Sequence, residues 1–206
     1  MKKDIKILDY GIGNLSSIYQ AFERFDIEIS FAKNAVDIKQ ADQLILPGVG
    51  AFIKGMSKLE SLELVDPIKD FAASGKPILG ICLGMQMLFE KSFEFGEHKG
   101  LGVIKGSVEK ITHQHGYKIP HISWSNLNIH DNKHKIMKNI TKHDAFYFVH
   151  SYTAKPSQAN NNLATCSFGD ENLCAVAGSD NVIGTQFHPE KSGEKGLNLI
   201  KSWLDE

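Results

Sequence analysis

Hydrophobic positions in the first half of the chain alternate between two spacings, and each spacing predicts a different element. Short, continuous apolar runs predict buried strands at residues 5–8, 27–31, 44–46 and 77–81. Between them apolar residues recur at helical spacing, which predicts helices from a cap at Asn14 to about Phe25 and over residues 51–59, 64–73 and 83–90. Strands that alternate with helices indicate parallel pairing through βαβ units.

The second half of the chain is richer in strand patterns. We expect strands at residues 102–104, 108–111, 119–124, 146–149, 163–168, 175–177 and 182–187. The polar stretch at 155–162 predicts a turn, and a last helix is expected over 194–204. The pattern therefore predicts one three-layer α/β domain over residues 1–206. It has a mostly parallel central sheet, helices on both faces and antiparallel strands at one edge.

Composition narrows the possible classes of protein. The formal net charge is −1, so charge gives no reason to expect nucleic acid or a membrane as partner. The apolar run near the N-terminus is too short and too charged for a signal peptide, and we expect a cytoplasmic protein. Three cysteines without a CxxC pair predict neither disulfides nor a metal site, and we expect no cofactor. Cys166 and Cys174 fit buried hydrophobic positions.

The remaining cysteine, Cys82, directly follows the strand at 77–81 and precedes a helix, in the motif GICLGMQ at residues 80–86. Glycines two positions before and after it permit a tight turn, the layout of a nucleophile elbow. The helix behind the turn favours the thiolate, and the N–H of Leu83 points to where an oxyanion would form. The motif predicts a nucleophile, although a buried core cysteine in a glycine-rich turn has the same local pattern.

A thiolate nucleophile needs a base and a group that orients the base. His188 stands at the end of the strand at 182–187, and sites in α/β sheets assemble at the carboxyl ends of the strands. Glu190 lies two residues further, on the same side of an extended backbone, and Pro189 keeps the turn out of a helix. We therefore predict that His188 is the base and Glu190 its orienting acceptor.

Acyl transfer also needs donors for the oxyanion. The turn PGVG at residues 47–50 follows the strand at 44–46, at the same edge of the sheet. Its glycines permit backbone conformations that aim N–H groups at a small ligand. We predict that Val49, Gly50 and Leu83 supply the oxyanion hole, with a plain strand-to-helix turn as the alternative.

These motifs match a known family. PGVGAF at 47–52, GICLGMQ at 80–86 and QFHPEKS at 186–192 resemble the triad class (class I) of glutamine amidotransferases, which implies a flavodoxin-like fold. LDYGIGNL at 8–15, KIPHISW at 118–124 and YFVHSY at 147–152 are similar to the glutaminase subunit of imidazole glycerol phosphate synthase. The resemblance extends from the first predicted strand to the last helix.

The resemblance implies a reaction and a pocket. Cys82 would attack the side-chain amide carbon of glutamine, and His188, held by Glu190, would protonate the departing ammonia and then activate water to hydrolyse the thioester. Carried over to this chain, the glutamine pocket comprises Gly50, Gln86, Glu94 and the backbone of His150, Ser151 and Tyr152. Glu94 is expected to bind the α-ammonium group, with an ordinary surface glutamate as the alternative.

The resemblance also implies a partner, because free ammonia would be lost to bulk water. The partner of the family is a (β/α)₈-barrel cyclase that forms imidazole glycerol phosphate and AICAR in histidine biosynthesis, in a heterodimer. The implied interface residues are Asn14, Trp124, Tyr147 and Lys191, although Trp124 and Tyr147 fit core aromatics equally well.

One segment departs from the family pattern. Ser123 and Ser125 stand where the family usually has glycine and asparagine. Similar subunits supply ammonia to synthases that form acetamidino groups on bacterial surface sugars, and this partner is the alternative. A non-catalytic relative and a cysteine peptidase built on the same elbow are two further hypotheses.

Overall fold

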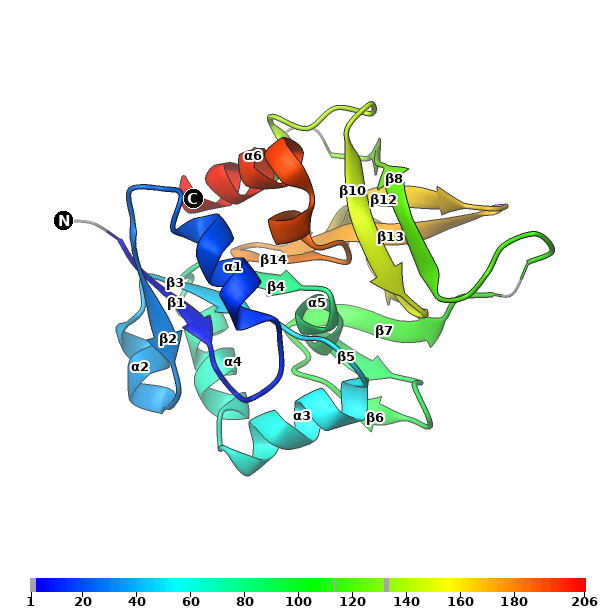
Figure 1. Cartoon of the computed structure of the whole chain (residues 1–206). Helices are drawn as coiled ribbons and strands as arrows, with labels where there is room; N and C mark the ends of the chain where they lie inside the picture. The colour runs from blue at the N-terminus through cyan, green and yellow to red at the C-terminus, as the bar shows by residue number, and fades with distance from the viewer. Residues whose placement is uncertain (1–2, 113, 132–133) are drawn as a thin grey trace.

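A large sheet forms the centre of the molecule (Figure 1). The computed structural model describes residues 3–112, 114–131 and 134–206. Within them the sheet has eight strands, in the spatial order β2 (Glu28–Ala32), β1 (Asp4–Leu8), β3 (Gln43–Leu46), β4 (Ile78–Ile81), β14 (Val182–Thr185), β13 (Glu171–Ser179), β12 (Asn162–Phe168) and β9 (Asn128–Ile129).

The pairing of neighbouring strands changes once across this sheet, from parallel to antiparallel. From β2 to β14 every neighbouring pair is parallel, and from β14 to β9 every pair is antiparallel. The carboxyl ends of β1, β3, β4 and β14 therefore meet at one edge, which is where α/β sheets assemble their sites. The predicted fold class is confirmed.

Helices cover both faces of the sheet. They are α1 (Leu15–Phe22), α2 (Ala35–Gln40), α3 (Phe52–Ser61), α4 (Val65–Ala73), α5 (Leu83–Met87) and α6 (Gly193–Leu204). In Figure 1, α1 and α6 lie on one side of the sheet, and α2, α3 and α4 on the other.

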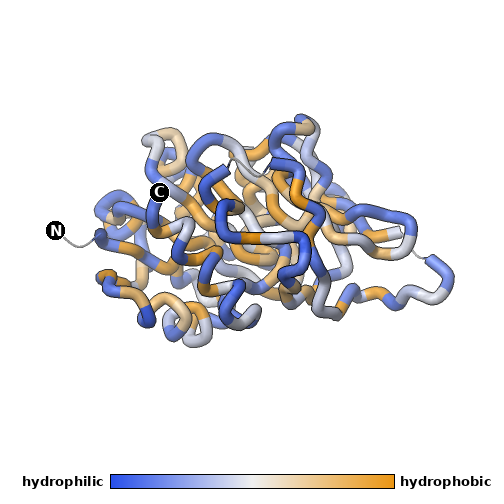
Figure 2. Tube along the Cα trace, turned by 90° about the horizontal axis from the view of Figure 1, so that it is seen from above, coloured by the Kyte–Doolittle hydropathy of each residue, from blue (hydrophilic) through white to orange (hydrophobic). Residues whose placement is uncertain are grey.

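Successive residues of the central strands point to opposite faces and so enter two separate hydrophobic clusters. Ile45 packs into the cluster that holds α1 and α6, whereas Leu44 and Leu46 pack into the cluster of the other helices. Figure 2 shows the hydrophobic stretches of the chain inside and the hydrophilic ones mostly at the periphery. Both faces are therefore buried, as a parallel sheet requires.

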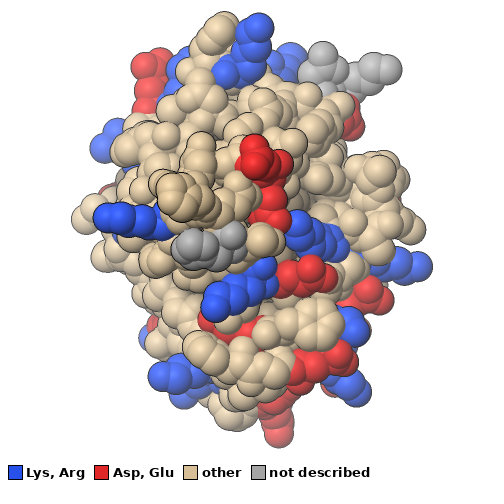
Figure 3. All heavy atoms as spheres, turned by 90° about the vertical axis from the view of Figure 1, so that its right-hand side faces the viewer, with Lys and Arg blue, Asp and Glu red and all other residues tan. Residues whose placement is uncertain are grey.

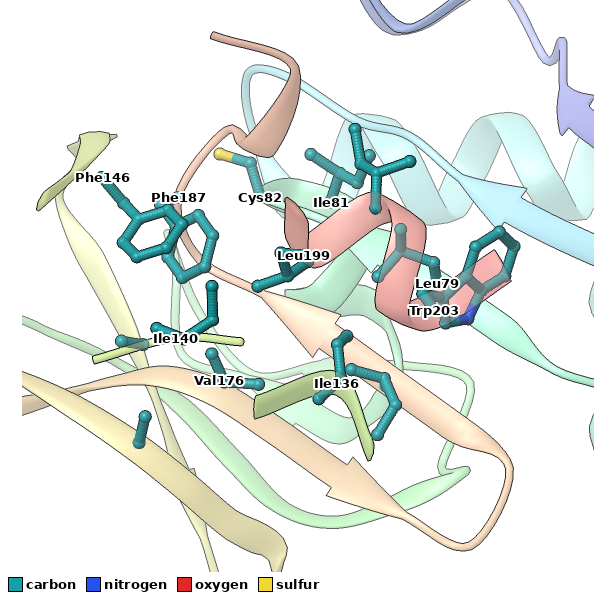
Figure 4. Packing of buried hydrophobic residues seen from close by; sticks show 14 of the residues in the cluster. Leu79, Ile81, Cys82, Ile136, Ile140, Phe146, Val176, Phe187, Leu199 and Trp203 are labelled. Atoms are coloured by element: carbon teal, nitrogen blue, oxygen red, sulfur yellow. The ribbon is translucent and has the colours of Figure 1, made fainter. Parts of the chain in front are cut away.

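The first cluster lies directly beneath the predicted nucleophile (Figure 4). Leu199 and Trp203 of α6 pack on the strand that ends at Cys82, and Trp203 meets Phe22 of α1 edge to face at 6.0 Å between ring centroids. The sulfur of Cys82 points away from Leu199, toward the edge of the sheet (Figure 4). The core thus supports the nucleophile from below and leaves its reactive atom at the rim.

Two small sheets flank the central one, and the hydrophobic pattern did not predict them. One joins β10 (Ala145–His150) to β8 (His121–Asn126), and the other has the order β11 (Tyr152–Pro156), β7 (Ile104–Lys110), β5 (Phe89–Ser92) and β6 (His98–Lys99). Short 3₁₀ turns complete the description at η1 (Lys135–Met137), η2 (Ala159–Asn161) and η3 (Pro189–Lys191).

Four predicted elements differ from the structure. The helix expected over 83–90 ends at Met87, because the chain then enters β5 and pairs with β7. In place of the two strands expected at 102–104 and 108–111 there is one strand, β7, which begins at Ile104, ends at Lys110 and passes through Gly106 at φ +131°. The turn expected at 155–162 begins inside β11, an edge strand, where Pro156 is tolerated.

The surface carries charges of both signs. On the face shown in Figure 3, Lys and Arg are interspersed with Asp and Glu among broad areas that carry neither. No helix in the described part of the chain has the length and apolar character that a membrane crossing requires.

Candidate active site

Cys82 occupies the sharp turn between β4 and α5. Its backbone lies at φ +55° and ψ −108°, a region that non-glycine residues rarely adopt. The surrounding structure holds it there: its N–H donates to the Thr185 carbonyl at 2.8 Å, and its carbonyl accepts from Gln86 N–H at 3.1 Å. A Cβ at Gly84 would collide with the carbonyl oxygen of Leu46. The glycine after the turn is thus required by the close approach of β3 to α5.

His188 interacts with both Cys82 and Glu190. Its Nδ1 is 2.8 Å from Oε1 of Glu190, and the two side chains are 4% and 1% exposed. The Cys82 side chain is the other group that acts on the imidazole. Burial lowers the pKa of His188, but the bonds and charges of Cys82 and Glu190 together raise it to about 10. A protonated imidazole beside a sulfur favours the thiolate.

The turn that carries His188 is tied to β10 at two points. The His188 N–H donates to the Tyr147 carbonyl at 3.0 Å. The Ser192 hydroxyl donates to the His188 carbonyl at 2.6 Å and accepts from Tyr147 N–H at 3.0 Å. The position of the imidazole therefore depends on β10 as well as on β14.

The turn expected to form the oxyanion hole is rotated away from that role. The N–H of Leu83, the expected donor, donates to the Gly48 carbonyl at 3.3 Å. In a trans peptide the C=O and N–H point in opposite directions, so the N–H of Val49 faces away from Cys82's neighbour Leu83. The peptide between Gly48 and Val49 must rotate before both N–H groups can point at one oxyanion.

The residues expected to form the glutamine pocket fall into two groups. One comprises Gln86 and residues 150–152, and the other comprises Glu94 and Gly50. Gln86 is 6% exposed, and its Nε2 donates to the Tyr152 carbonyl at 3.1 Å. His150 is also buried, and the Ser151 carbonyl accepts from Ile111 N–H at 3.0 Å. The carbonyls of Ser151 and Tyr152 thus already accept hydrogen bonds from other parts of this chain.

Glu94 and Gly50 lie close to the start of α3. Oε2 of Glu94 accepts from Phe52 N–H at 2.6 Å, so the carboxylate caps α3 two residues beyond Gly50. Gly50 has φ +90°, and a Cβ there would meet nothing within 4 Å. The sequence thus requires glycine at position 50 for its backbone conformation, and Glu94 lies next to the predicted oxyanion turn.

Comparison with known proteins gives the family. Residues 6–205 match the family model described as "Glutamine amidotransferase class-I". The chain belongs to the class-I glutamine amidotransferases. It is therefore a glutamine-hydrolysing enzyme, as the motifs predicted.

Two curated relatives of this amidotransferase extend over nearly its full length. "Imidazole glycerol phosphate synthase subunit HisH 1" of Legionella pneumophila (strain Lens) is 48% identical over 209 residues, covering 97% of this chain and 98% of the relative. "Imidazole glycerol phosphate synthase subunit HisH" of Lactococcus lactis is 45% identical and covers 99% of both.

A solved structure supports the fold. "Structure of PurLQS from Thermotoga maritima" superposes with a TM-score of 0.74 at 23% identity, covering 100% of this chain and 99% of that one.

The four residues expected at a partner interface in this amidotransferase do not form one cluster of contacts. Asn14 caps α1 by accepting from Ser17 N–H at 3.4 Å. Trp124 and Tyr147 are cross-strand neighbours on β8 and β10 with ring centroids 5.9 Å apart. Trp124 is 57% exposed, which excludes the core alternative for that residue. Lys191 is exposed and closes η3, directly after Glu190.

Sequence reasoning missed two buried residues that touch this site. Gln186 is fully buried, and its Nε2 donates to Sγ of Cys82 at 3.8 Å. Tyr10 donates its hydroxyl to the Pro47 carbonyl at 2.7 Å, at the first residue of the predicted oxyanion turn. Strand alternation offered a signal for Gln186, because residues 186 and 188 share one side of extended backbone. Tyr10 follows β1 at the same edge as the other parts.

Burial and the nearby Cys82 raise the pKa of Tyr10 well above its usual value, so its hydroxyl keeps its proton. Among the described residues, no group of three or more His, Cys, Asp or Glu side chains is placed to hold a metal ion. The groups that this site brings together are a thiol, an imidazole, a carboxylate and amide donors.

Proposed function

We propose that this chain is the glutaminase subunit of an imidazole glycerol phosphate synthase and that Cys82, His188 and Glu190 are its catalytic triad. The observation that carries the proposal is the row of three groups at one sheet edge. The Cys82 thiol meets the imidazole, and the imidazole meets Glu190 at 2.8 Å. The two long relatives named as subunits of that synthase support the same pathway.

The triad performs two half-reactions. The thiolate of Cys82 attacks the side-chain amide carbon of glutamine, and the carbonyl π electrons move to oxygen to form a tetrahedral oxyanion. When the oxyanion collapses, the C–N bond breaks, and His188 gives its proton to the nitrogen, so that ammonia leaves and a thioester remains. Neutral His188 then removes a proton from water, which attacks the thioester and releases glutamate and the thiolate.

The remaining predicted residues have roles in binding glutamine. Gly50 ends the predicted oxyanion turn, and Gln86 donates its N–H to the Cys82 carbonyl and its side-chain amide to the Tyr152 carbonyl, within the backbone stretch 150–152. The Glu94 carboxylate offers an anionic partner for the α-ammonium group of glutamine, while its Oε2 also caps α3. The rotated Gly48–Val49 peptide and Leu83 supply the oxyanion donors once the peptide turns.

The partner we propose is a (β/α)₈-barrel cyclase, which binds this chain as a heterodimer in the cytoplasm and receives the ammonia. Half-exposed and exposed aromatics on β8 and β10, with Asn14 and Lys191 nearer the triad edge, are the proposed docking residues. The mixed charges in Figure 3 support a protein partner over nucleic acid or a membrane.

The alternative partner, a synthase that forms acetamidino groups on surface sugars, gains no support from the relatives described above. The changed segment that motivated it, with Ser123 and Ser125, faces the interior side of β8, where both hydroxyls contact His121. These two departures are therefore explained within this chain, without a different partner.

Synthesis by the complex with the cyclase tests this proposal. Glutamine and ammonia are supplied in turn as the nitrogen source. We expect Cys82→Ala to abolish synthesis from glutamine, a loss of at least about 10⁴-fold, and to leave synthesis from ammonia unchanged. Cys166→Ala is the matched control, since Cys166 is buried in the core and should keep both rates.

Two outcomes would contradict the proposal. If Cys82→Ala still hydrolyses glutamine, the nucleophile is wrong. If the natural chain hydrolyses glutamine but never supports the cyclase, the pathway is wrong and the glutaminase chemistry stands.

A further inference from the structure

A chain of buried amides connects the nucleophile to the small sheets. Nε2 of Gln186 donates to Sγ of Cys82 at 3.8 Å, within hydrogen-bonding range for sulfur. Oε1 of Gln186 accepts from Nε2 of Gln86 at 2.9 Å. Gln86 donates in addition to the carbonyl of Tyr152 at 3.1 Å. Gln186 is 0% exposed, so no water competes for its amide.

The far end of this chain fixes which way each amide points. A backbone carbonyl can only accept, so Gln86 must present its NH₂ group to Tyr152. The same NH₂ group reaches Gln186, which must therefore answer with its carbonyl oxygen. The NH₂ group of Gln186 is then left facing the sulfur of Cys82. The orientation of both side-chain amides follows from donors and acceptors alone.

Two histidines extend the network to β8. Nδ1 of His150 donates to the Tyr152 carbonyl at 2.8 Å, so the Nε2 of a neutral His150 accepts from Nδ1 of His121 at 3.1 Å. Nε2 of His121 accepts in turn from the Ser123 hydroxyl at 2.7 Å. Burial lowers the pKa of both rings, that of His150 to about 3, and the neutral rings keep this one-way order of donors.

We propose that Gln186 is a dedicated hydrogen-bond donor to the Cys82 sulfur, which stabilises the thiolate and holds it in line with His188. The proposal rests on Cys82 being the nucleophile of the proposed function. An N–H bond to sulfur is stronger for a thiolate than for a thiol, because charge strengthens the acceptor. Gln186 therefore raises the fraction of Cys82 that is thiolate. The amide network prevents the Gln186 side-chain amide from flipping and presenting its oxygen to the sulfur.

Alkylation of Cys82 by iodoacetamide tests this without glutamine or a partner. The rate is followed from pH 5 to pH 9 in the free chain, and peptide mass spectrometry identifies the modified residue. The other two thiols are poor competitors, since burial raises the pKa of Cys166 to about 12 and that of Cys174 further. The titratable groups facing the sulfur are His188, with Glu190 behind it, and Tyr10.

We expect Gln186→Met, which keeps the length of the side chain and removes the donor, to slow alkylation at pH 7 about tenfold, the size of one hydrogen bond to a charged group. The pH of half-maximal rate should rise by about one unit. The matched control is Gln43→Met, a buried glutamine at the far end of β3 that donates to the Trp203 carbonyl at 3.3 Å. It should leave the profile unchanged.

A folded Gln186→Met chain with the natural pH profile would overturn the proposal. If that variant does not fold, Gln186→Asn keeps an amide but withdraws it from the sulfur, and an unchanged profile there would overturn it equally. Failure of the proposed function is separate: a chain that never hydrolyses glutamine would still show the Gln186 effect on alkylation.

Discussion

The two sides of Cys82 differ in how complete they are. On one side, His188 is buried, is bonded to Glu190 at 2.8 Å and is fastened to β10 through Ser192. On the other, the Gly48 carbonyl occupies the N–H of Leu83, and the neighbouring Val49 is 43% exposed. The proposed base is built into the interior, whereas the proposed oxyanion turn reaches the surface and points its Val49 N–H away from Leu83.

This difference teaches where control can act. A docking protein cannot reach a side chain that is only a few per cent exposed, but it can contact Val49 and Gly50, the two exposed residues of the turn. Rotation of one peptide costs no buried contact of the base side. We infer that Cys82 and His188 are already in position in the free chain. Rotation of the Gly48–Val49 peptide, which would orient the oxyanion donors, is then the step that a partner controls.

The largest expected effect comes from the oxyanion side. The free chain should hydrolyse glutamine at least about 10²–10³-fold more slowly than the complex with the cyclase and its ligand, the loss expected for even one missing oxyanion donor. Glutamate release, measured with and without the partner, checks this. Equal rates would mean that the turn does not limit the reaction, and Cys82→Ala gives the background in both states.

A smaller effect is expected from the base side, and it depends on pH. The pKa of His188 is raised from 6.5 to about 10, so the stability that its protonated form contributes is fully present below about pH 6.5. It is lost as the pH rises through about 10. Glu190→Gln should lower the unfolding free energy by about 2 kcal/mol at pH 6, with a smaller deficit at pH 10.

Urea unfolding of both chains at the two pH values measures this difference. Lys191→Gln, at the exposed neighbouring position, serves as the control and should show no such dependence. A deficit that grows toward pH 10 would mean that the imidazole is not protonated in the folded chain.

The smallest effect is expected at the root of the oxyanion turn. Tyr10→Phe removes the buried donor to the Pro47 carbonyl, which should lower the unfolding free energy by about 1 kcal/mol. Hydrogen exchange of residues 48–50 should become faster, while exchange at His188 stays the same. Tyr19→Phe is the control, since that ring stacks on Phe31 at 5.7 Å away from the turn. Faster exchange on both sides would remove the distinction between them.

The parallel half of the fold was predictable because its signals are local. The strands are short apolar runs, two of which are followed directly by Pro47 and Cys82. Asn14 caps α1 as its position suggested. The helix expected over 83–90 failed because its residues through Phe89 are all buried, and a fully apolar run does not distinguish helix from strand. Only pairing with β7, distant along the chain, decides that Phe89 begins a strand.

The site was predictable to the same extent. Residues at strand ends, such as Cys82 and His188, could be read from their motifs, and strand alternation could have added Gln186. The direction of the Gly48–Val49 peptide could not be predicted, because either rotation fits the same glycine-rich pattern. The His121–His150 contact depends on the register of β8 against β10, which no local signal encodes.

The two hydrogen bonds of the Ser192 hydroxyl have an evolutionary consequence. Its hydroxyl joins the strand that displays Tyr147 outward to the backbone that positions His188 inward. A substitution that shifts β10 to suit an altered neighbour would also displace the imidazole. Substitutions on the outer surface of β10 are therefore selected against when they reduce catalysis. The sequence of this strand should diverge more slowly than that of other exposed segments.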